Sequence, residues 1–191
     1  LSQCPKLSFE IIPFSPPVEE LPTRHYWTVD MFTRFWVDDF FSTDVDRVLY
    51  LDADMIITGD IAALWNSDIE GCLFGAVTIP DAMDWERLGT PVDKGYFNSG
   101  VLLIDMKRWR MQEPRRDLLD YISKQGGGLL YPDQDALNAC LYDQRHALDY
   151  EWNVIAPFSW PNGISSLSED ERRQILRRAQ IVHFNGQSKP W

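Results

Sequence analysis

The stretch RVLYLDADMIITGD, residues 47–60, constrains the fold of this chain more than any other part of the sequence. The apolar run 47–51 is typical of a strand with both faces buried, and two carboxylates, Asp52 and Asp54, follow it directly. Because side chains alternate along an extended backbone, we expect Asp52 and Asp54 to project in the same direction. Two like charges this close repel each other, and burial raises the free-energy cost. The stretch therefore predicts a group that offsets this charge.

A hard divalent cation is one such group. Mg²⁺ and Mn²⁺ prefer oxygen ligands and commonly keep coordination positions free for substrate phosphates. In an open α/β sheet, ligands bind beyond the carboxyl ends of the strands, which is where the two aspartates fall. A solvated pair of charges in a turn is the alternative, and a bare D-x-D does not decide between the two. The apolar residues on both sides of the pair favour the cation.

Strand and helix patterns alternate along the rest of the chain. This alternation predicts an α/β fold with a mainly parallel sheet, and 191 residues that are 45% hydrophobic suffice for one domain with a single core. Short apolar runs predict strands over residues 7–14, 47–51, 71–77, 96–106 and 180–184, the fourth with a polar break at Asn98 to Gly100. Apolar periodicity and capping residues predict helices over residues 27–41, 59–66, 113–128, 132–142 and 168–179.

Charge and cysteine content exclude several classes of function. The net charge of −11 and the pI near 4.6 argue against nonspecific binding to nucleic acid or to an anionic membrane. The three cysteines are widely spaced and odd in number, so we expect neither a disulfide framework nor a zinc site. The sequence has no signal-peptide pattern and no apolar run near 18 residues. These features predict a cytoplasmic location.

Two reaction classes use a pair of aspartates in this arrangement. In phosphatases of the haloacid-dehalogenase type, the first Asp is a nucleophile and the second is an acid or base. In nucleotide-sugar glycosyl transfer, the pair holds a metal on a diphosphate. The phosphatase pattern usually has Thr or Val two residues after the second Asp, where this chain has Ile56, and it usually lies in the first strand of its domain.

Four later segments make the second class more specific. They are YFNSGVLLIDMKRWR (96–110), YPDQDALNACL (131–141), LDYEWNV (148–154) and HFNGQSKPW (183–191). In this order after LYLDAD, they resemble retaining glycosyltransferase family 8, which includes bacterial lipopolysaccharide galactosyl- and glucosyltransferases and glycogenin. The resemblance implies a GT-A fold, which is a nucleotide-binding α/β domain around a mixed sheet. It also implies Mn²⁺ or Mg²⁺, a nucleotide-sugar donor such as UDP-galactose or UDP-glucose, and a saccharide acceptor such as lipopolysaccharide or another glycan.

The resemblance assigns the metal ligands first. Asp52 and Asp54 match the family's D-x-D, which ligates the metal and reaches toward the ribose of the donor. His183 matches the third protein ligand. Such a ligand set is also chemically reasonable, because imidazole suits Mn²⁺ and two carboxylates with one imidazole leave positions free for diphosphate oxygens. The alternative for His183 alone is a histidine that is satisfied within the core.

Catalytic groups follow by the same resemblance. Lys189 would supply positive charge to the departing β-phosphate, and Gly186 would let the backbone approach the phosphates. Asp133 and Gln134 match polar residues that line the donor-sugar pocket. Gln134 stands where a nucleophile would be expected, but an amide is a poor nucleophile, so the expected role is to stabilise the transition state. Lys189 as a solvated surface charge and Gln134 as a buried amide bonded to backbone are the alternatives.

Three further residues are expected to contact the donor. Asn98 matches a polar residue of the sugar pocket, and Arg34 matches an arginine that contacts the donor from the helix before the D-x-D strand. Asp81 matches an acid near the sugar hydroxyls, although the loop around it differs from the family pattern. A buried amide for Asn98 and an ordinary helix ion pair for Arg34 are the alternatives.

The chain departs from the family at its start, which resembles the third strand of the family's domain. Two β-α units of about 30 residues each put the expected missing part, which binds the nucleotide, near 60 residues. Residues 1–191 are therefore expected to form one partial catalytic domain. Exposed sheet edges are expected as well, which a second copy or a partner would cover. A non-catalytic nucleotide-sugar-binding remnant thus stands beside the enzyme hypothesis, and peripheral association with the inner face of the membrane would need groups outside this stretch.

Overall fold

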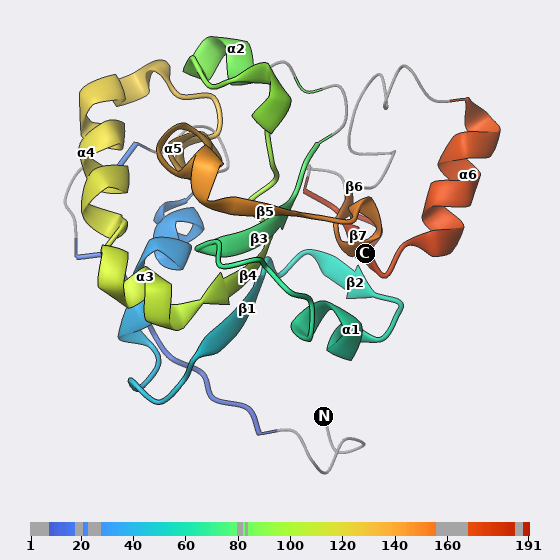
Figure 1. The fold of residues 1–191 in the computed structure, drawn as a ribbon, viewed down its shortest axis with the longest axis horizontal. Coiled ribbons are helices and arrows are strands. Elements are labelled where there is room, and N and C mark those ends of the chain that lie inside the picture. Colours follow the sequence, from blue (N-terminus) through green and yellow to red (C-terminus); the bar gives the residue numbers. More distant parts are fainter. Residues whose placement is uncertain are drawn as a thin grey trace.

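The computed structural model describes residues 8–17, 21–22, 28–79, 82, 84–155, 168–185 and 189–191. Two sheets lie side by side, one of four strands and one of three. Figure 1 shows α3 (Met106–Gln112) and α4 (Arg115–Gln125) on the far side of the larger sheet from α1 (Ile61–Trp65) and α6 (Glu169–Arg178). Because the strands form two sheets and not one continuous sheet, the candidate site lies at the junction between them.

The larger sheet has the strand order β1 (Arg47–Leu51), β4 (Val101–Asp105), β3 (Phe74–Val77), β5 (Arg145–Leu148). The central strand β4 runs antiparallel to both of its neighbours, and β3 runs parallel to β5. All but the last residue of β4 are buried, because this strand is covered on both faces. In contrast, only Val48 of β1 is buried, because no described strand pairs with its outer edge. The prediction that residues 47–51 are buried on both faces is therefore wrong, although the strand itself is present.

The smaller sheet has the order β2 (Met55–Ile57), β7 (Ile181–His183), β6 (Val154–Ile155). Strand β2 is antiparallel to β7, and β6 is parallel to β7. Three of the five pairings between described strands are thus antiparallel. The α/β class with mixed sheets is as expected, but the parallel share is smaller than the alternation of elements suggests.

Local capping chemistry sets several helix boundaries where the sequence predicts them. The Asp60 side chain accepts a hydrogen bond from the Ala62 N–H and caps α1. Ser168 and Glu171 form a capping box at the start of α6. The other helices are 3-10 helix η1 (Val29–Asp39), α2 (Asp84–Leu88), η2 (Val92–Lys94), η3 (Gly126–Gly128), α5 (Pro132–Leu141), η4 (Tyr142–Gln144) and η5 (Tyr150–Trp152). Among the described residues, none of the helices combines the length and the hydropathy that crossing a membrane requires.

The main core lies between the larger sheet and the helices η1, α3, α4 and α5. Helix η1 contributes the buried residues Phe32, Phe35, Trp36 and Val37 to this core, and its backbone departs from helical values at Trp36. A second apolar cluster, which includes Leu64, Val101 and Ile181, fills the space between the two sheets and α1. The second cluster fixes the smaller sheet to the larger one, and the site forms where the two sheets meet.

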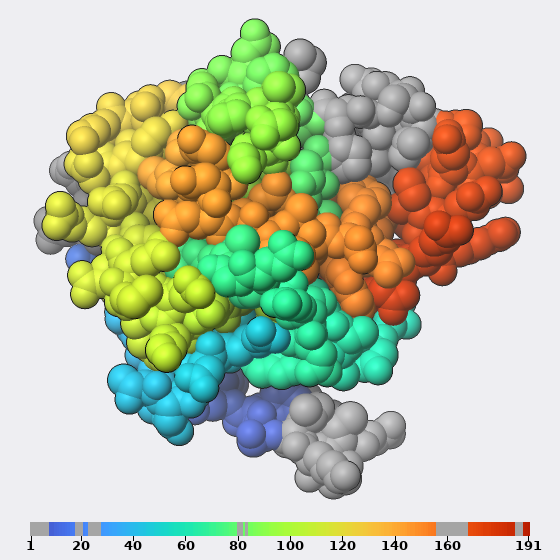
Figure 2. All heavy atoms as spheres, in the orientation of Figure 1, coloured from blue at the N-terminus to red at the C-terminus, as the bar shows by residue number. Residues whose placement is uncertain are grey.

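The strand predicted over residues 7–14 is wrong in its described part. Residues 8–14 form no strand, and Phe9 and Ile11 are 63% and 92% exposed. Figure 2 shows these N-terminal residues (blue) at the margin of the molecule. Phe14 alone joins the core, through ring contacts with Trp36 and Phe40. An apolar, β-branched segment becomes a strand only with a partner strand, and none of the described strands lies beside this one.

Candidate active site

The D-x-D segment joins the two sheets. The chain leaves the larger sheet at the end of β1 and enters the smaller one at β2, with Asp52 and Asp54 between them. The Asp52 N–H donates to the Gly100 carbonyl (2.9 Å), and the Phe184 N–H donates to the Asp54 carbonyl (2.9 Å). These bonds tie the segment to the start of β4 on one side and to the end of β7 on the other. Both aspartates are therefore fixed by backbone contacts before any side-chain contact is considered.

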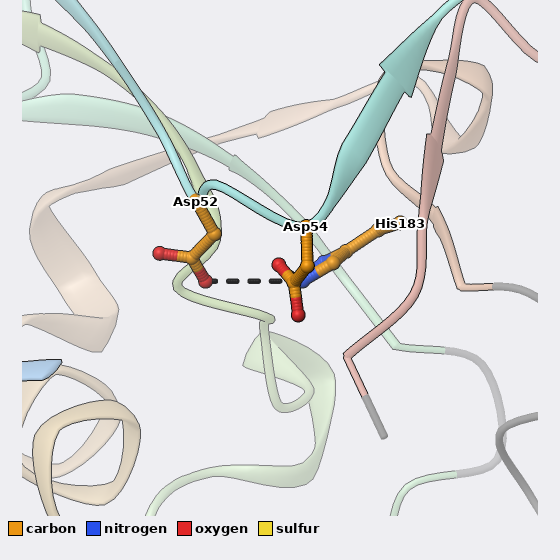
Figure 3. A group of neighbouring side chains, drawn as sticks. All are labelled: Asp52, Asp54 and His183. Atoms are coloured by element: carbon orange, nitrogen blue, oxygen red, sulfur yellow. Dashed lines mark ion pairs between the residues drawn. The ribbon is translucent and has the colours of Figure 1, made fainter. Parts of the chain in front are cut away.

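His183, the last residue of β7, completes a group of three. Its Nε2 lies 3.2 Å from Asp54 Oδ1 and 3.8 Å from Asp52 Oδ2. Figure 3 shows the two aspartates and the imidazole turned toward one another from the D-x-D segment and from β7. One ligand atom from each residue can be chosen so that all three lie within 4.8 Å of one another, which is the one such group in the described ranges. The structure thus brings together the three predicted metal ligands.

The chemistry of this group fits a divalent cation. His183 is 1% exposed, and its Nε2 is enclosed without a hydrogen-bond partner of good geometry. A buried nitrogen that faces two carboxylate oxygens needs either a proton or a cation between them, since their lone pairs otherwise repel. Two carboxylates and one imidazole are suitable ligands for Mn²⁺, and Mg²⁺ accepts the carboxylates.

Lys189 lies against the outer oxygen of Asp54. Its ammonium donates to Asp54 Oδ2 (2.6 Å) and to the Phe184 carbonyl. Burial alone would raise the pKa of Asp54, but the contacts with His183 and Lys189 outweigh it and hold the pKa well below its ordinary value. The Asp54 carboxylate is consequently charged. The Lys189 side chain is 28% exposed, so it lies on the solvent-facing side of the group formed by Asp52, Asp54 and His183.

Asp52 is held by a different set of partners. Its Oδ1 accepts hydrogen bonds from Arg34 Nη2 (2.8 Å) and from the Tyr50 hydroxyl (2.9 Å). The Arg34 guanidinium also lies over the Tyr50 ring at 4.7 Å and forms an ion pair with Asp133 at 3.3 Å. These contacts leave Oδ2 as the oxygen of Asp52 that faces His183.

Arg34 is 4% exposed, and protein groups engage each of its three nitrogens. Burial alone would lower its pKa, but the charge of Asp52 and the contacts with Tyr50 and Asp133 raise it overall, so Arg34 is a permanent buried cation. Arg34 lies on the core side of Asp52, against the oxygen that does not face His183. The predicted direct contact between Arg34 and the donor stays a prediction.

Asn98, Asp133 and Gln134 meet beside the start of α5. Asn98 Nδ2 donates to Gln134 Oε1 (2.9 Å), and the Ser99 N–H donates to the same oxygen (3.1 Å). The Ser99 hydroxyl donates to Asp133 Oδ2 (3.1 Å). All four residues are buried, and burial raises the pKa of Asp133 despite the opposing charge of Arg34. The side-chain carbonyl of Gln134 thus accepts hydrogen bonds from two protein donors.

Three residues of the site escape prediction from the sequence. A Cβ at Gly100 would lie 2.4 Å from His183 Cε1 and 2.8 Å from Asp52 Oδ2, so only glycine fits there. The polar break in strand 96–106 was the available signal for this position. Tyr50 donates to Asp52, and Asn153 lies 3.0 Å from His183 Nδ1. Both lie in segments that carry the family resemblance, but neither was singled out. Asp81 and Gly186 lie outside the described residues.

Comparison with known proteins identifies relatives over nearly the whole chain. The profile of the family described as "Glycosyl transferase family 8" matches residues 6–191. General stress protein A of Bacillus subtilis (strain 168) is 35% identical over 156 residues, which cover 77% of this chain and 53% of that protein. A lipopolysaccharide 1,2-glucosyltransferase of Escherichia coli is 34% identical over 188 residues, which cover 93% of this chain and 54% of that protein. The chain spans about half the length of these curated relatives.

Solved structures agree with the profile. The glycosyltransferase GlyE of Streptococcus pneumoniae TIGR4 superposes with a TM-score of 0.64 at 30% identity and covers 84% of this chain and 38% of that one. The galactosyltransferase LgtC, solved with donor and acceptor sugar analogs, superposes with a TM-score of 0.73 at 24% identity. That match covers 87% of this chain and 62% of LgtC, and it concerns the fold.

Proposed function

The chain belongs to glycosyltransferase family 8 and has the GT-A fold, and from this premise we propose that it transfers a hexosyl group from a nucleotide sugar to a saccharide acceptor with retention of anomeric configuration. The convergence of Asp52, Asp54 and His183 is the observation that carries the proposal. Membership of this family argues against the dehalogenase-type phosphatase, which the aspartate pair alone left open.

The proposed cation is Mn²⁺ or Mg²⁺, and the imidazole favours Mn²⁺. Asp52 Oδ2, Asp54 Oδ1 and His183 Nε2 would hold it, since these are the atoms that face one another. When bound, the ion would neutralise charge on the diphosphate of the donor.

Lys189 is proposed to assist the departure of the nucleoside diphosphate. Its ammonium is partly exposed next to Asp54, so it can supply positive charge at the edge of the site. A compact charge directed at a developing phosphate anion stabilises the transition state more than the ground state. Gly186, three residues earlier, is proposed to let the backbone approach the phosphates.

The donor sugar is proposed to lie against Asn98, Asp133 and Gln134. The Gln134 carbonyl already accepts two hydrogen bonds from the protein, which disfavours a nucleophilic role and supports a stabilising one. The acceptor hydroxyl is proposed to attack from the face that the diphosphate leaves, which retains configuration without a protein nucleophile. Contacts of Arg34 and Asp81 with the donor are proposed from the family resemblance alone, since Arg34 is buried and Asp81 lies outside the described residues.

UDP-galactose or UDP-glucose is the proposed donor, and lipopolysaccharide or another glycan is the proposed acceptor. The names of relatives support this choice, since they include lipopolysaccharide 1,2-glucosyltransferase and lipopolysaccharide 1,3-galactosyltransferase. A cytoplasmic location, peripheral membrane association and a homo-oligomer remain predictions.

The test is donor hydrolysis and transfer by the wild type, Asp54→Ala and His183→Ala at fixed Mn²⁺. We expect both substitutions to lower turnover by more than about tenfold, because each removes a metal ligand. Near-normal turnover in both would rule out the metal assignment. The remaining alternative is a non-catalytic nucleotide-sugar-binding remnant. A thermal-shift screen of UDP, GDP and phosphomonoesters, with and without Mn²⁺, tests it together with the transfer assay. A remnant would bind UDP with Mn²⁺ yet transfer nothing.

A further inference from the structure

Asn153 stands between His183, one of the candidate metal ligands, and Asn98, one of the residues proposed to face the donor sugar. It follows η5 and directly precedes β6, the strand that pairs with β7. Its side chain is 1% exposed and spans two groups. Oδ1 lies 3.0 Å from His183 Nδ1, and Nδ2 donates to Asn98 Oδ1 (2.8 Å).

Two backbone N–H groups fix the direction of every hydrogen bond in this chain of amides. The Gly100 N–H donates to Asn98 Oδ1 (2.9 Å), and the Ser99 N–H donates to Gln134 Oε1 (3.1 Å). A backbone N–H can only donate, so both of these side-chain oxygens are acceptors. Asn153 must then direct its NH₂ group at Asn98 and its carbonyl at the imidazole.

The consequence for His183 follows directly. A carbonyl facing Nδ1 requires that this nitrogen carry the ring proton. Nε2 is then the nitrogen with the lone pair, and it faces Asp52 and Asp54. A partner of this kind on the second ring nitrogen is what usually orients a metal-binding histidine.

We propose that Asn153 is a positioning residue that fixes the His183 ring for metal binding and ties it to the orientation of the Asn98 and Gln134 amides. The first half concerns the cation site, and the second couples that site to the donor-sugar pocket. The inference rests on the proposed function only for the identity of the ion and the sugar. Asparagine suits the position because one side must accept and the other must donate.

Titration with Mn²⁺ alone tests the first half, with no nucleotide present. We expect Asn153→Ala to weaken Mn²⁺ binding by about 10- to 100-fold, as loss of a ligand's orienting partner typically does. Asn138→Ala is the matched control, because Asn138 is equally buried and bonds the backbone of Phe97 and of Gln134 but not His183. We expect its Mn²⁺ affinity to stay within about threefold of wild type, by the same rule. Equal affinities for Asn153→Ala and wild type would overturn the proposal.

Asn153→Asp separates the two halves, since a carboxylate still accepts from His183 but cannot donate to Asn98. We expect Mn²⁺ affinity within about threefold of wild type, because the orienting acceptor is kept. We expect the KM for the donor at saturating Mn²⁺ to rise by about fivefold or more, as for a lost buried hydrogen bond. An unchanged KM would overturn the coupling to the sugar pocket.

Nitrogen-15 NMR of the metal-free wild type needs no substitution and therefore no assumption about folding. The chain has three histidines, so the His183 signals can be assigned with His25→Gln and His146→Gln. We expect Nδ1 of the His183 ring to carry a proton, whether or not Nε2 carries one as well. An unprotonated Nδ1 would overturn the proposal. If the wild type binds no Mn²⁺, the proposed metal site fails, while the NMR result still decides the role of Asn153.

Discussion

Asp52 and Asp54 stand two residues apart, yet their surroundings differ in kind. Asp52 is held from beneath by Arg34, which is buried, bonded through all three nitrogens and stacked on Tyr50. Asp54 is held from outside by Lys189, which is partly exposed and reaches it through a flexible stem. A guanidinium fixed in the core gives a permanent anchor, whereas an ammonium at the surface is a partner that can exchange. We infer that the position of Asp52 is fixed by the core, whereas Asp54 lies on the solvent-facing side of the site, where its partner Lys189 can move.

Arg34→Ala should have the largest effect on stability. It leaves the carboxylates of Asp52 and Asp133 without their buried counter-charge, so we expect the free energy of unfolding to fall by about 3–5 kcal/mol. Urea denaturation with EDTA present measures this without any contribution from metal. A loss below about 1 kcal/mol in the free energy of unfolding is typical of a surface ion pair. It would remove the distinction between the Arg34–Asp52 pair and the Lys189–Asp54 pair.

Gly100→Ala should come second. The new methyl would collide with the His183 ring and with Asp52 Oδ2, so we expect a loss of about 1–3 kcal/mol in the free energy of unfolding together with weaker Mn²⁺ binding. Gly127→Ala is the matched control, because a Cβ there meets no atom within 4 Å. Equal stability and Mn²⁺ affinity for the two variants would show that the site tolerates a side chain at this point.

Tyr50→Phe should have a smaller effect. It removes one hydrogen bond to Asp52 Oδ1 but keeps the ring beneath Arg34, so we expect a loss of about 0.5–1.5 kcal/mol. Denaturation with EDTA measures that loss. The accompanying change in Mn²⁺ affinity should be smaller than for Gly100→Ala. A loss as large as that of Arg34→Ala would mean that the hydroxyl, and not the guanidinium, anchors Asp52.

Lys189→Met should change stability least. A partly exposed ion pair contributes less than about 1 kcal/mol, and the methionine keeps the apolar stem. Turnover should nevertheless fall by about 100-fold if the ammonium stabilises the departing diphosphate. The measurement pairs urea denaturation with donor turnover at saturating Mn²⁺. A large loss of stability with normal turnover would mean that Lys189 has a structural role and not the proposed catalytic one.

Local chemistry in the sequence predicts much of the fold. Asp60 begins α1 and the Ser168–Glu171 capping box begins α6, because a cap depends only on residues within one turn. The failures concern long-range partners. Residues 8–14 have the composition of a strand but lack a neighbour, and β1 is less buried than its apolar residues suggest because it lies at a sheet edge.

The candidate site divides in the same way. Residue type and order brought Asp52, Asp54 and His183 to attention, and the fold places them together. Gly100 and Asn153 matter through contacts made across two sheets, which neither spacing nor composition encodes. Arg34 was noticed, but its buried position beneath Asp52 depends on how η1 packs against the larger sheet.

Pulsed electron paramagnetic resonance of protein-bound Mn²⁺ tests the central claim most directly, because it detects a nitrogen ligand on the ion. The account predicts one imidazole coupling in the wild type, retained in His146→Gln and lost in His183→Gln. Bound Mn²⁺ without a nitrogen coupling, or with a coupling that survives His183→Gln, would contradict the account.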